Sequence, residues 1–533
     1  MVTTTGSPVA APSRLDRLRS GIAAGEHVLP AVGLVTFAIS LGLYVPTLMP
    51  GVGFWDTAEF QTVGPVLGIA HPTGFPTYTL LGWLASVVLS PVGETALRMN
   101  LLSALLVAGA AGFVALATGR ILGRPALAMG AGLLLAVAPI TWWTATRADA
   151  HALHLFLLAA LLERLVAWGQ AARAGSPRAS RPLLEASFIY GLSLGNHGLT
   201  VLLAPGIAAY LVAVQPSIIR QWRLVAACAG IILLTVAALY AYIPIRASMN
   251  PPLNYAHPSS LEGFLFLVSA AQFVGLLQDP LARGIGPIVD VFVTQAGWIP
   301  VALSLIGLAS LALGAGRTGW LGPRLALLTA LWFVITTIFS AGYGDGFVDR
   351  YYLGPLAILA LWTAVGASAL LDGALGLIDG HSVASGRIGS TARHALPVVV
   401  AFLLLSYPAW RAADGWSQND SSRDTDGERW GAAALGVLEP NAVVVSWWSY
   451  STNLWYQQFI LGLRPDILVA DDRVRLDEGW GELPETIDRF LAQGRPVYLL
   501  IPGEDWIAGL GTRYELEPVQ TLPGYSPLWR VLP

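Results

Sequence analysis

The feature that most constrains this chain is a series of apolar segments long enough to cross a lipid bilayer. A transmembrane helix needs about 20 mostly apolar residues. Only 12% of the residues are charged, whereas soluble proteins carry about 25%. The sequence therefore predicts a polytopic α-helical membrane protein with about eleven transmembrane helices. Their approximate positions are 28–46, 99–119, 125–141, 151–168, 183–196, 199–215, 224–245, 297–315, 324–341, 354–372 and 395–410.

Arginine placement predicts which side of the membrane each loop faces, because cytoplasmic loops are enriched in Lys and Arg. The chain contains no Lys. With a cytoplasmic N-terminus and eleven crossings, fifteen Arg flank the membrane on the cytoplasmic side and five on the outer side. A weaker apolar run at 77–90 must then be re-entrant or interfacial, since one more crossing would invert every later loop. We expect a retained first helix and a multi-pass protein of the inner (plasma) membrane.

The composition changes near residue 411. The segment 411–533 holds ten Arg against eighteen Asp and Glu. Strand-like runs at 442–446, 466–470 and 496–502 alternate with helical patterns at 453–462 and 483–494, which predicts a small α/β domain. We therefore divide the chain into a transmembrane domain, 1–410, and an α/β domain, 411–533, that lies outside the cytoplasm.

The segment GFWDTAEFQTVGPVLGIAHPTGFP, at 53–76, contains ionisable residues in the first outer loop. Asp56 and Glu59 are three residues apart, so on a helix beginning at Asp56 they share one face. Two such carboxylates can act as a general base and its orienting partner, or hold a divalent cation. The alternative is an acidic pair that stabilises the helix N-terminus. His71 could donate to an anion or satisfy a loop carbonyl.

Other ionisable residues fall in the remaining outer loops, and such groups at membrane depth mark sites by default. Arg246 could bind a lipid phosphate or snorkel to the interface. Three carboxylates of the tail, Asp466, Asp471 and Asp472, are interpreted as strand-end and surface residues. The stretch from 260 to 277 suggests an interfacial helix. Three further pairs are candidates. Asp149 and His151 could also form an N-cap and first helical turn, and Asn196 and His197 could also form a simple turn. Asp349 and Arg350 could form a local ion pair or an anion site.

Several motifs together resemble a bacterial membrane family that is placed among the GT-C glycosyltransferases and includes an animal transmembrane protein O-mannosyltransferase. The first-loop signature is WDTAEF followed by LGIAHPTGFPTYTLLG. Ala58 and Thr73 stand where the family has Gly and a second Pro. The further matches, in the family's order, are TWWTATRADAHAL, GLSLGNH, YIPIRASMNPPLNY, DRYYLGP and WYQQFILGLRPDILV.

The resemblance implies transfer of a sugar, mannose or another hexose, from a polyprenyl-phosphate donor to an extracytoplasmic hydroxyl, with inversion. The acceptor would be a protein Ser or Thr, or a lipid. Asp56 would be the base and Glu59 would position it or the sugar. Arg246, with His71 or His197, would stabilise the departing phosphate. No cofactor is required, although Asp56, Glu59 and Asp149 could hold a divalent cation. No nucleic-acid partner is implied.

A lipid or glycan flippase of the cell envelope is the main alternative. Transporters of that kind place their polar site near the bilayer midplane between repeated halves. Here the polar candidates gather at one side, and the two halves show no matching broken helices. A non-catalytic scaffold is a third reading, which the presence of both Asp56 and Glu59 disfavours.

Overall fold

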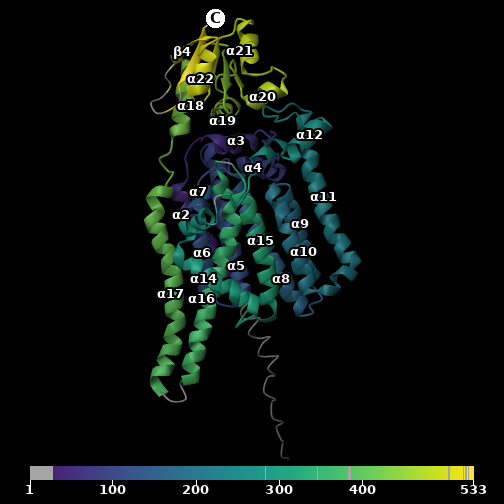
Figure 1. Cartoon of the computed structure of the whole chain (residues 1–533), viewed down its shortest axis with the longest axis vertical. Helices are drawn as coiled ribbons and strands as arrows, with labels where there is room; N and C mark the ends of the chain where they lie inside the picture. The colour runs from purple at the N-terminus through teal and green to yellow at the C-terminus, as the bar shows by residue number, and fades with distance from the viewer. Residues whose placement is uncertain are drawn as a thin grey trace, which may run out of the picture.

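A computed structural model of the chain describes residues 28–532 apart from 283, 345, 382–385, 502–503, 520, 522–524 and 526. The N-terminal arginines counted in the topology prediction, and Asp345 in the last outer loop, lie outside the described residues. Figure 1 shows a long helical bundle with a smaller domain at one end. That domain contains the C-terminus of the chain.

Each of the eleven predicted segments is helical. The membrane helices are α2 (Val28–Tyr44), α5 (Thr95–Leu122), α6 (Pro125–Ala136) with α7 (Pro139–Ala145), α8 (Ala150–Arg173), α9 (Ser180–Leu194), α10 (Ala204–Val214), α11 (Trp222–Ala247), α13 (Gly286–Ala296) with α14 (Trp298–Leu313), α15 (Gly322–Ala341), α16 (Leu353–His381) and α17 (Gly386–Asn419). Short 3-10 turns connect several of them, namely η1 (Val45–Thr47), η2 (Gly198–Leu203), η3 (Pro216–Arg220), η5 (Gly319–Leu321) and η6 (Val348–Tyr352).

Not all eleven segments are long and apolar enough to cross a bilayer alone. In the described chain, seven helices are long and apolar enough to cross, or nine if each bent pair forms one span. The bent pairs are α6–α7, with a bend of 73°, and α13–α14, with a bend of 107°. The remaining two segments, α9 and η2–α10, are shorter. The chain is thus a multi-pass membrane protein.

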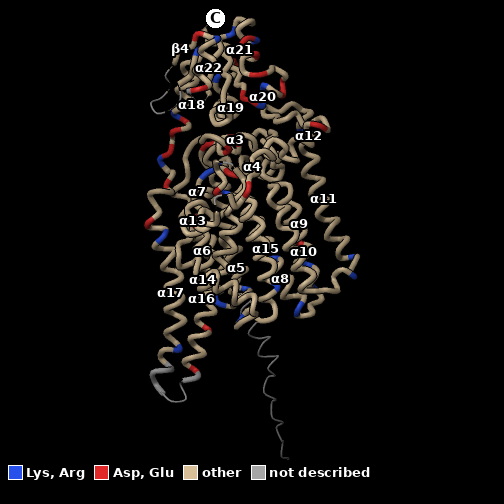
Figure 2. The backbone as a smooth tube through the Cα atoms, viewed as in Figure 1, with Lys and Arg blue, Asp and Glu red and all other residues tan. Residues whose placement is uncertain are grey.

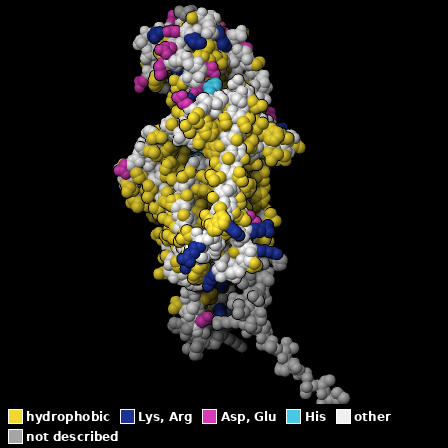
Figure 3. Space-filling model, turned by 90° about the vertical axis from the view of Figure 1, so that its right-hand side faces the viewer, with side chains coloured by type: hydrophobic (Ala, Val, Ile, Leu, Met, Phe, Trp, Pro, Cys, Tyr) yellow, Lys and Arg dark blue, Asp and Glu magenta, His cyan; other side chains and the backbone are white. Residues whose placement is uncertain are grey.

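The outside of the bundle is apolar where lipid would surround it. On α11, Leu233 and Leu234 are 68% and 73% exposed, which would be costly in water but suits hydrocarbon. Figure 3 shows hydrophobic side chains across the middle of one face, with basic side chains gathered towards the end away from the C-terminal domain.

The first loop forms two short helices, α3 (Trp55–Val63) and α4 (Pro76–Val88). Helix α3 ends at Val63, before Gly64 and Pro65, because Pro cannot continue a helix interior. Gln61 fixes α3 on the bundle, since its Nε2 donates to Asn100 Oδ1 (2.9 Å) and its Oε1 accepts from the Gly53 N–H (2.9 Å). Both helices are too short to span, as expected for re-entrant or interfacial helices.

The C-terminal domain is a five-stranded mixed sheet in the order β2-β1-β3-β5-β4. The three predicted strands pair in parallel, with Val444 opposite Val469 and Tyr498, and β5 then pairs antiparallel with β3 and β4. Helix α17 continues nine residues past Trp410 before this domain begins. The elements are α18 (Asp426–Val437), β1 (Val443–Ser446), α19 (Trp448–Phe459), β2 (Leu468–Ala470), α20 (Asp472–Asp477), α21 (Leu483–Leu491), β3 (Val497–Leu500), α22 (Glu504–Gly511), β4 (Glu515–Val519) and β5 (Leu528–Leu532).

The C-terminal domain is fixed to the first loop by buried polar contacts. Asn453 Nδ2 donates to the carbonyls of Gly53 (2.8 Å) and Gly427 (3.0 Å). The Tyr456 hydroxyl accepts from the Ala96 N–H at the start of α5 (2.9 Å). A third tie joins α20 to the loop that precedes α12 (Leu261–Val268) and η4 (Ala271–Leu276). There, Asp477 Oδ2 accepts from the Ala256 N–H (2.8 Å).

Candidate active site

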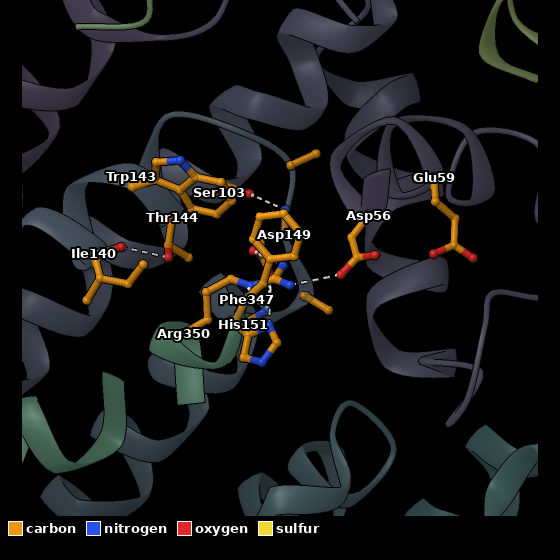
Figure 4. Close-up of polar contacts among 12 residues, drawn as sticks. Asp56, Glu59, Ser103, Ile140, Trp143, Thr144, Asp149, His151, Phe347 and Arg350 are labelled. Carbon is orange, nitrogen blue, oxygen red and sulfur yellow. Dashed lines mark hydrogen bonds and ion pairs between the residues drawn. The ribbon is translucent and has the colours of Figure 1, made fainter. Parts of the chain in front are cut away.

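Arg350 joins two carboxylates that are far apart in the sequence. Its Nη1 donates to Asp149 Oδ2 (2.8 Å) and its Nη2 to Asp56 Oδ2 (3.0 Å), with the guanidinium lying between them (Figure 4). The Arg350 side chain is only 6% exposed, and a buried charge of this kind requires paired partners. Asp349, the residue before it, is exposed. Arg350 therefore pairs across the bundle and not with its neighbour.

Asp56 lies in the first turn of α3 and reaches towards the C-terminal domain. Its Oδ2 accepts from Arg350, and its Oδ1 accepts from Trp448 Nε1 (3.4 Å). Burial alone would raise the pKa of Asp56, but the Arg350 guanidinium and the His71 ring outweigh it and hold the pKa below its usual range. The side chain remains 25% exposed. Asp56 is thus an ionised carboxylate that is accessible from one side.

Asp149 is fully buried and caps helix α8. Its Oδ1 accepts from the His151 backbone N–H (2.8 Å) and contacts His151 Nδ1 (2.9 Å). The N-cap alternative is therefore present, together with the ion pair to Arg350. Burial would raise the pKa of Asp149, whereas Arg350 and His151 lower it, and the net direction is down.

Glu59 pairs with His71 one helical turn beyond Asp56. Glu59 is 2% exposed. Its Oε1 accepts from the His71 backbone N–H (2.8 Å) and its Oε2 from His71 Nδ1. Burial would lower the pKa of His71, but the Glu59 carboxylate overcomes this and raises it to about 9. At neutral pH, His71 is therefore an imidazolium that neutralises Glu59.

A cavity of about 530 Å³ lies between the bundle and the C-terminal domain, and we call it the central cavity. Among its lining residues, the bundle contributes Asp56, His71, His151, His197 and Arg350, and the C-terminal domain contributes Trp447, Trp448, Asp471, Asp472 and Arg473. His151 and His197 face each other with ring centroids 4.6 Å apart. Figure 2 shows acidic and basic residues meeting beneath the C-terminal domain near α3 and α7.

Glu59 and Asp149 do not line the central cavity themselves but bond to the lining residues His71 and Arg350. Three other candidates from the sequence neither line the cavity nor bond to a side chain that does. The side chain of Asn196 is buried and donates to the Ala150 carbonyl (3.0 Å). Arg246 binds backbone carbonyls, with Nε donating to Leu67 O (2.7 Å) and Nη2 to Val66 O (3.2 Å). Asp349 is exposed. The structure thus brings Asp56, His71, Asp149, His151, His197 and Arg350 together with Glu59, but not these three.

The sequence interpretation missed the contribution of the C-terminal domain. Trp447 and Trp448 follow strand β1, at its carboxyl end, where α/β domains commonly form sites. That placement was a usable signal. Asp471 was interpreted as structural, and it does cap α20 by accepting from the Val474 N–H (2.7 Å). It also lines the central cavity.

The group of potential metal ligands that the structure brings together differs from the one the sequence indicated. Ligand atoms of Asp56, Glu59 and His71 lie within 4.8 Å of one another, whereas Asp149 is engaged by Arg350 and His151. In this arrangement His71 Nδ1 carries a proton shared with Glu59, and a protonated ring nitrogen has no lone pair for a metal. Asp56 is already neutralised by Arg350. The group as it stands fits an ion-pair network better than a cation site.

Comparison with known proteins shows what the chain is similar to. Residues 56–218 match the family model described as the protein O-mannosyl-transferase TMEM260 N-terminal domain. Over this segment the chain is similar to the TMEM260 family. The mouse protein O-mannosyl-transferase TMEM260 is 24% identical over 491 residues, which cover 88% of this chain and 65% of the mouse protein. The chain thus spans less than two thirds of that relative.

Two solved structures are similar in fold. ArnT from Cupriavidus metallidurans, bound to undecaprenyl phosphate, has a TM-score of 0.58 at 15% identity and covers 95% of this chain and 97% of its own. The oligosaccharyltransferase AglB from Archaeoglobus fulgidus, in complex with an inhibitory peptide and a dolichol-phosphate, has a TM-score of 0.52 at 14% identity, covering 89% and 69%. The predicted GT-C fold is confirmed.

Proposed function

We propose that the protein transfers a sugar, mannose or another hexose, from a polyprenyl phosphate to a Ser or Thr hydroxyl on the outer side of the membrane. The observation that carries this proposal is the Asp56 carboxylate, which is ionised, partly exposed and held by Arg350 and Trp448 in a cavity between bundle and domain. The mouse relative is named a protein O-mannosyl-transferase, and ArnT is described with undecaprenyl phosphate. The name of the mouse relative supports a protein acceptor, and the ArnT ligand supports a lipid-linked donor.

Asp56 acts as the general base in this proposal. The acceptor oxygen attacks the anomeric carbon, the bond from that carbon to the phosphate oxygen breaks, and its electron pair leaves with the lipid phosphate. The hydroxyl proton passes to Asp56. Because the pKa of Asp56 is lowered, it is a weak base that takes the proton once bond formation makes the hydroxyl acidic. Attack from the face opposite the phosphate inverts the anomeric configuration.

The departing phosphate is stabilised at the side of the cavity formed by His151, His197 and Arg350. His151 Nε2 is buried without a hydrogen-bond partner among the described residues, and its Nδ1 is held by Asp149. This nitrogen is therefore placed to bond a phosphate oxygen. Arg350 lines the same side, with its guanidinium shared between Asp56 and Asp149. Arg246 stays a prediction as a phosphate ligand, because its present partners are the Val66 and Leu67 carbonyls.

Asp56→Asn is the direct test of this function. The Asn amide keeps the shape of the side chain and weakens the hydrogen bond to Arg350. The amide cannot accept the proton of the acceptor hydroxyl. Loss of a general base costs about 10²–10⁴-fold in turnover, so we expect such a fall in sugar transfer by purified protein in lipid nanodiscs. Glu59→Gln should cost less. Donor binding, measured with the lipid-linked sugar alone, should be kept by Asp56→Asn and weakened by His151→Gln.

Near-normal transfer by Asp56→Asn would remove Asp56 as the base. The same donor-binding measurement on Arg246→Lys decides the Arg246 prediction, because Lys keeps the charge but loses the planar fork. Unchanged donor affinity would exclude Arg246 from the phosphate site.

A further inference from the structure

A second cavity, of about 450 Å³, adjoins the central cavity beneath the C-terminal domain, and we call it the junction cavity. The loop 250–255 forms its wall on the bundle side, and α19, β2 and α20 form its wall on the domain side. The two cavities share Tyr255, Trp448, Asp471 and Arg473. The junction cavity therefore borders the catalytic site at Trp448, the residue that donates to Asp56.

Strand β2 gives the junction cavity a wall in which, among the described residues, the backbone groups of Val469 are free. It is an edge strand of the sheet, and Ile467, Leu468 and Val469 line the cavity. The Ile467 carbonyl accepts from Gln458 Nε2 (3.0 Å). The Leu468 N–H donates to the Ala442 carbonyl on the β1 side (2.9 Å). In a parallel strand the backbone N–H and C=O groups of successive residues point to opposite sides. Those of Leu468 point to β1, so those of Val469 point to the free edge. Unpaired edges of this kind accept an added strand.

The charged groups around the junction cavity are paired with one exception. Asp477 accepts from the Ala256 N–H (2.8 Å) and pairs with Arg473, and Glu478 lies 3.3 Å from His257 Nε2. Asp471 is 2% exposed, uses Oδ1 to cap α20, and borders both cavities. Burial raises the pKa of Asp471 to about 7. Near neutral pH this carboxyl can therefore donate to or accept from an uncharged polar group.

We propose that the junction cavity binds the acceptor as an extended polypeptide segment that pairs with the free edge of β2. A residue of that segment then reaches past Trp448 and presents its Ser or Thr hydroxyl to Asp56. Main-chain pairing provides affinity that does not depend on sequence, and the cavity bordered by Tyr255 and Asp471 receives alternate side chains. This inference rests on the proposed function, since it names how that reaction recognises its acceptor.

Peptide binding to the full chain tests this inference without any donor. A fluorescent ten-residue peptide of alternating Val and Thr is titrated into nanodisc-embedded protein and followed by anisotropy. A matched peptide carries N-methyl groups on every second backbone amide, which removes the donors to the strand edge. One net hydrogen bond is worth about 0.5–1.5 kcal/mol, so loss of the donor to the Val469 carbonyl should weaken binding about two- to tenfold. A benzophenone version should label the segment 467–469.

Val469→Pro provides the matched change on the protein. It removes the edge N–H and leaves the pairing of Leu468 with β1, and Pro is tolerated on edge strands. Val469→Ala shortens the side chain but keeps the N–H. Peptide affinity should fall several-fold more for Pro than for Ala. If Val469→Pro fails to fold, the N-methyl peptide still decides the question on the natural chain.

The outcomes separate this inference from the proposed function. Loss of peptide transfer by Val469→Pro with donor affinity unchanged supports both. Equal binding of the two peptides, or labelling away from 467–469, overturns the strand-edge mode. Sugar transfer to a lipid hydroxyl without peptide binding overturns it as well but leaves the glycosyltransferase function standing. Peptide labelling at 467–469 in a protein that neither binds nor consumes the donor would support peptide binding in the junction cavity. The same result would contradict the glycosyltransferase function.

Discussion

The ion pair between His71 and Glu59 gives the site a pH dependence of defined direction. The pKa of His71 is raised to about 9, above its ordinary value of 6.5. The pair therefore stabilises the fold fully below about pH 6.5, and this contribution is lost as the pH rises through about 9. His71→Asn keeps a donor near Nδ1 but removes the charge.

We expect the melting temperature of the natural protein to fall between pH 7 and pH 10 more steeply than that of His71→Asn. Differential scanning fluorimetry in nanodiscs measures both curves. Parallel curves across this range would show that the imidazolium does not contribute to stability.

Trp448 positions Asp56 from the C-terminal domain. Trp448→Phe keeps an aromatic ring in the wall but removes the Nε1 donor to Asp56. A hydrogen bond to a charged group is worth about 1.5 kcal/mol or more, so kcat should fall about tenfold with little change in donor affinity. Trp447→Phe is the control, since Trp447 also lines the central cavity. Equal effects of the two variants would contradict a positioning role for Trp448.

Single residues were predictable as candidates but not as partners. Asp56, Asp149 and Arg350 stood out because charges at membrane depth are costly. The pairs themselves join residues 201 and 294 positions apart, and hydropathy carries no information on contacts at such separations. In the sequence, Asp349 and Arg350 were equally good site candidates. The η6 turn buries Arg350 and leaves Asp349 exposed.

At the scale of elements, helix α18 packs against the first loop with almost no space between them. A Cβ added at Gly427 would lie 2.2 Å from the Val52 carbonyl oxygen. Gly427→Ala should therefore push α18 away from the loop and destabilise the protein by about 1–3 kcal/mol. Gly436→Ala is the control on the same helix, because a Cβ there meets nothing within 4 Å.

Thermal melting and limited proteolysis of α18 measure this effect. Gly427→Ala should melt lower and be cut faster, whereas Gly436→Ala should be neutral or slightly stabilised by its better helix propensity. Similar behaviour of the two variants would mean that the domain does not dock through this contact.

The helices and strands that could be predicted from the sequence are those with a strong hydrophobic pattern. The membrane helices and the strands β1, β2 and β3 are dense in apolar residues, so length and period located them. Strands β4 and β5 were missed because β4 reads ELEPV, in which charges and a Pro obscure the alternation. Helix α13 was missed because the chain turns by 107° before α14, and Gly297 at that turn has a φ of 88°.

For the whole molecule, the arginine distribution predicts a cytoplasmic N-terminus and an exported C-terminal domain. In the structure the site lies beneath that domain, so its compartment decides where the reaction occurs. A reporter that is active only after export, fused after Asn419 at the end of α17, should be active. The same reporter fused in the turn after Arg173, at the end of α8, should be inactive. Reversal of this pattern would place Asp56 in the cytoplasm.

The contact between Trp448 and Asp56 spans 392 residues, and this separation has a consequence for biosynthesis. A ribosome adds about 5–20 residues per second, so roughly 20–80 s pass between synthesis of Asp56 and synthesis of Trp448. During that interval the bundle can insert and meet lipid-linked sugars while one wall of its site does not yet exist. We expect nascent chains to be inert until the last domain has crossed the membrane and docked.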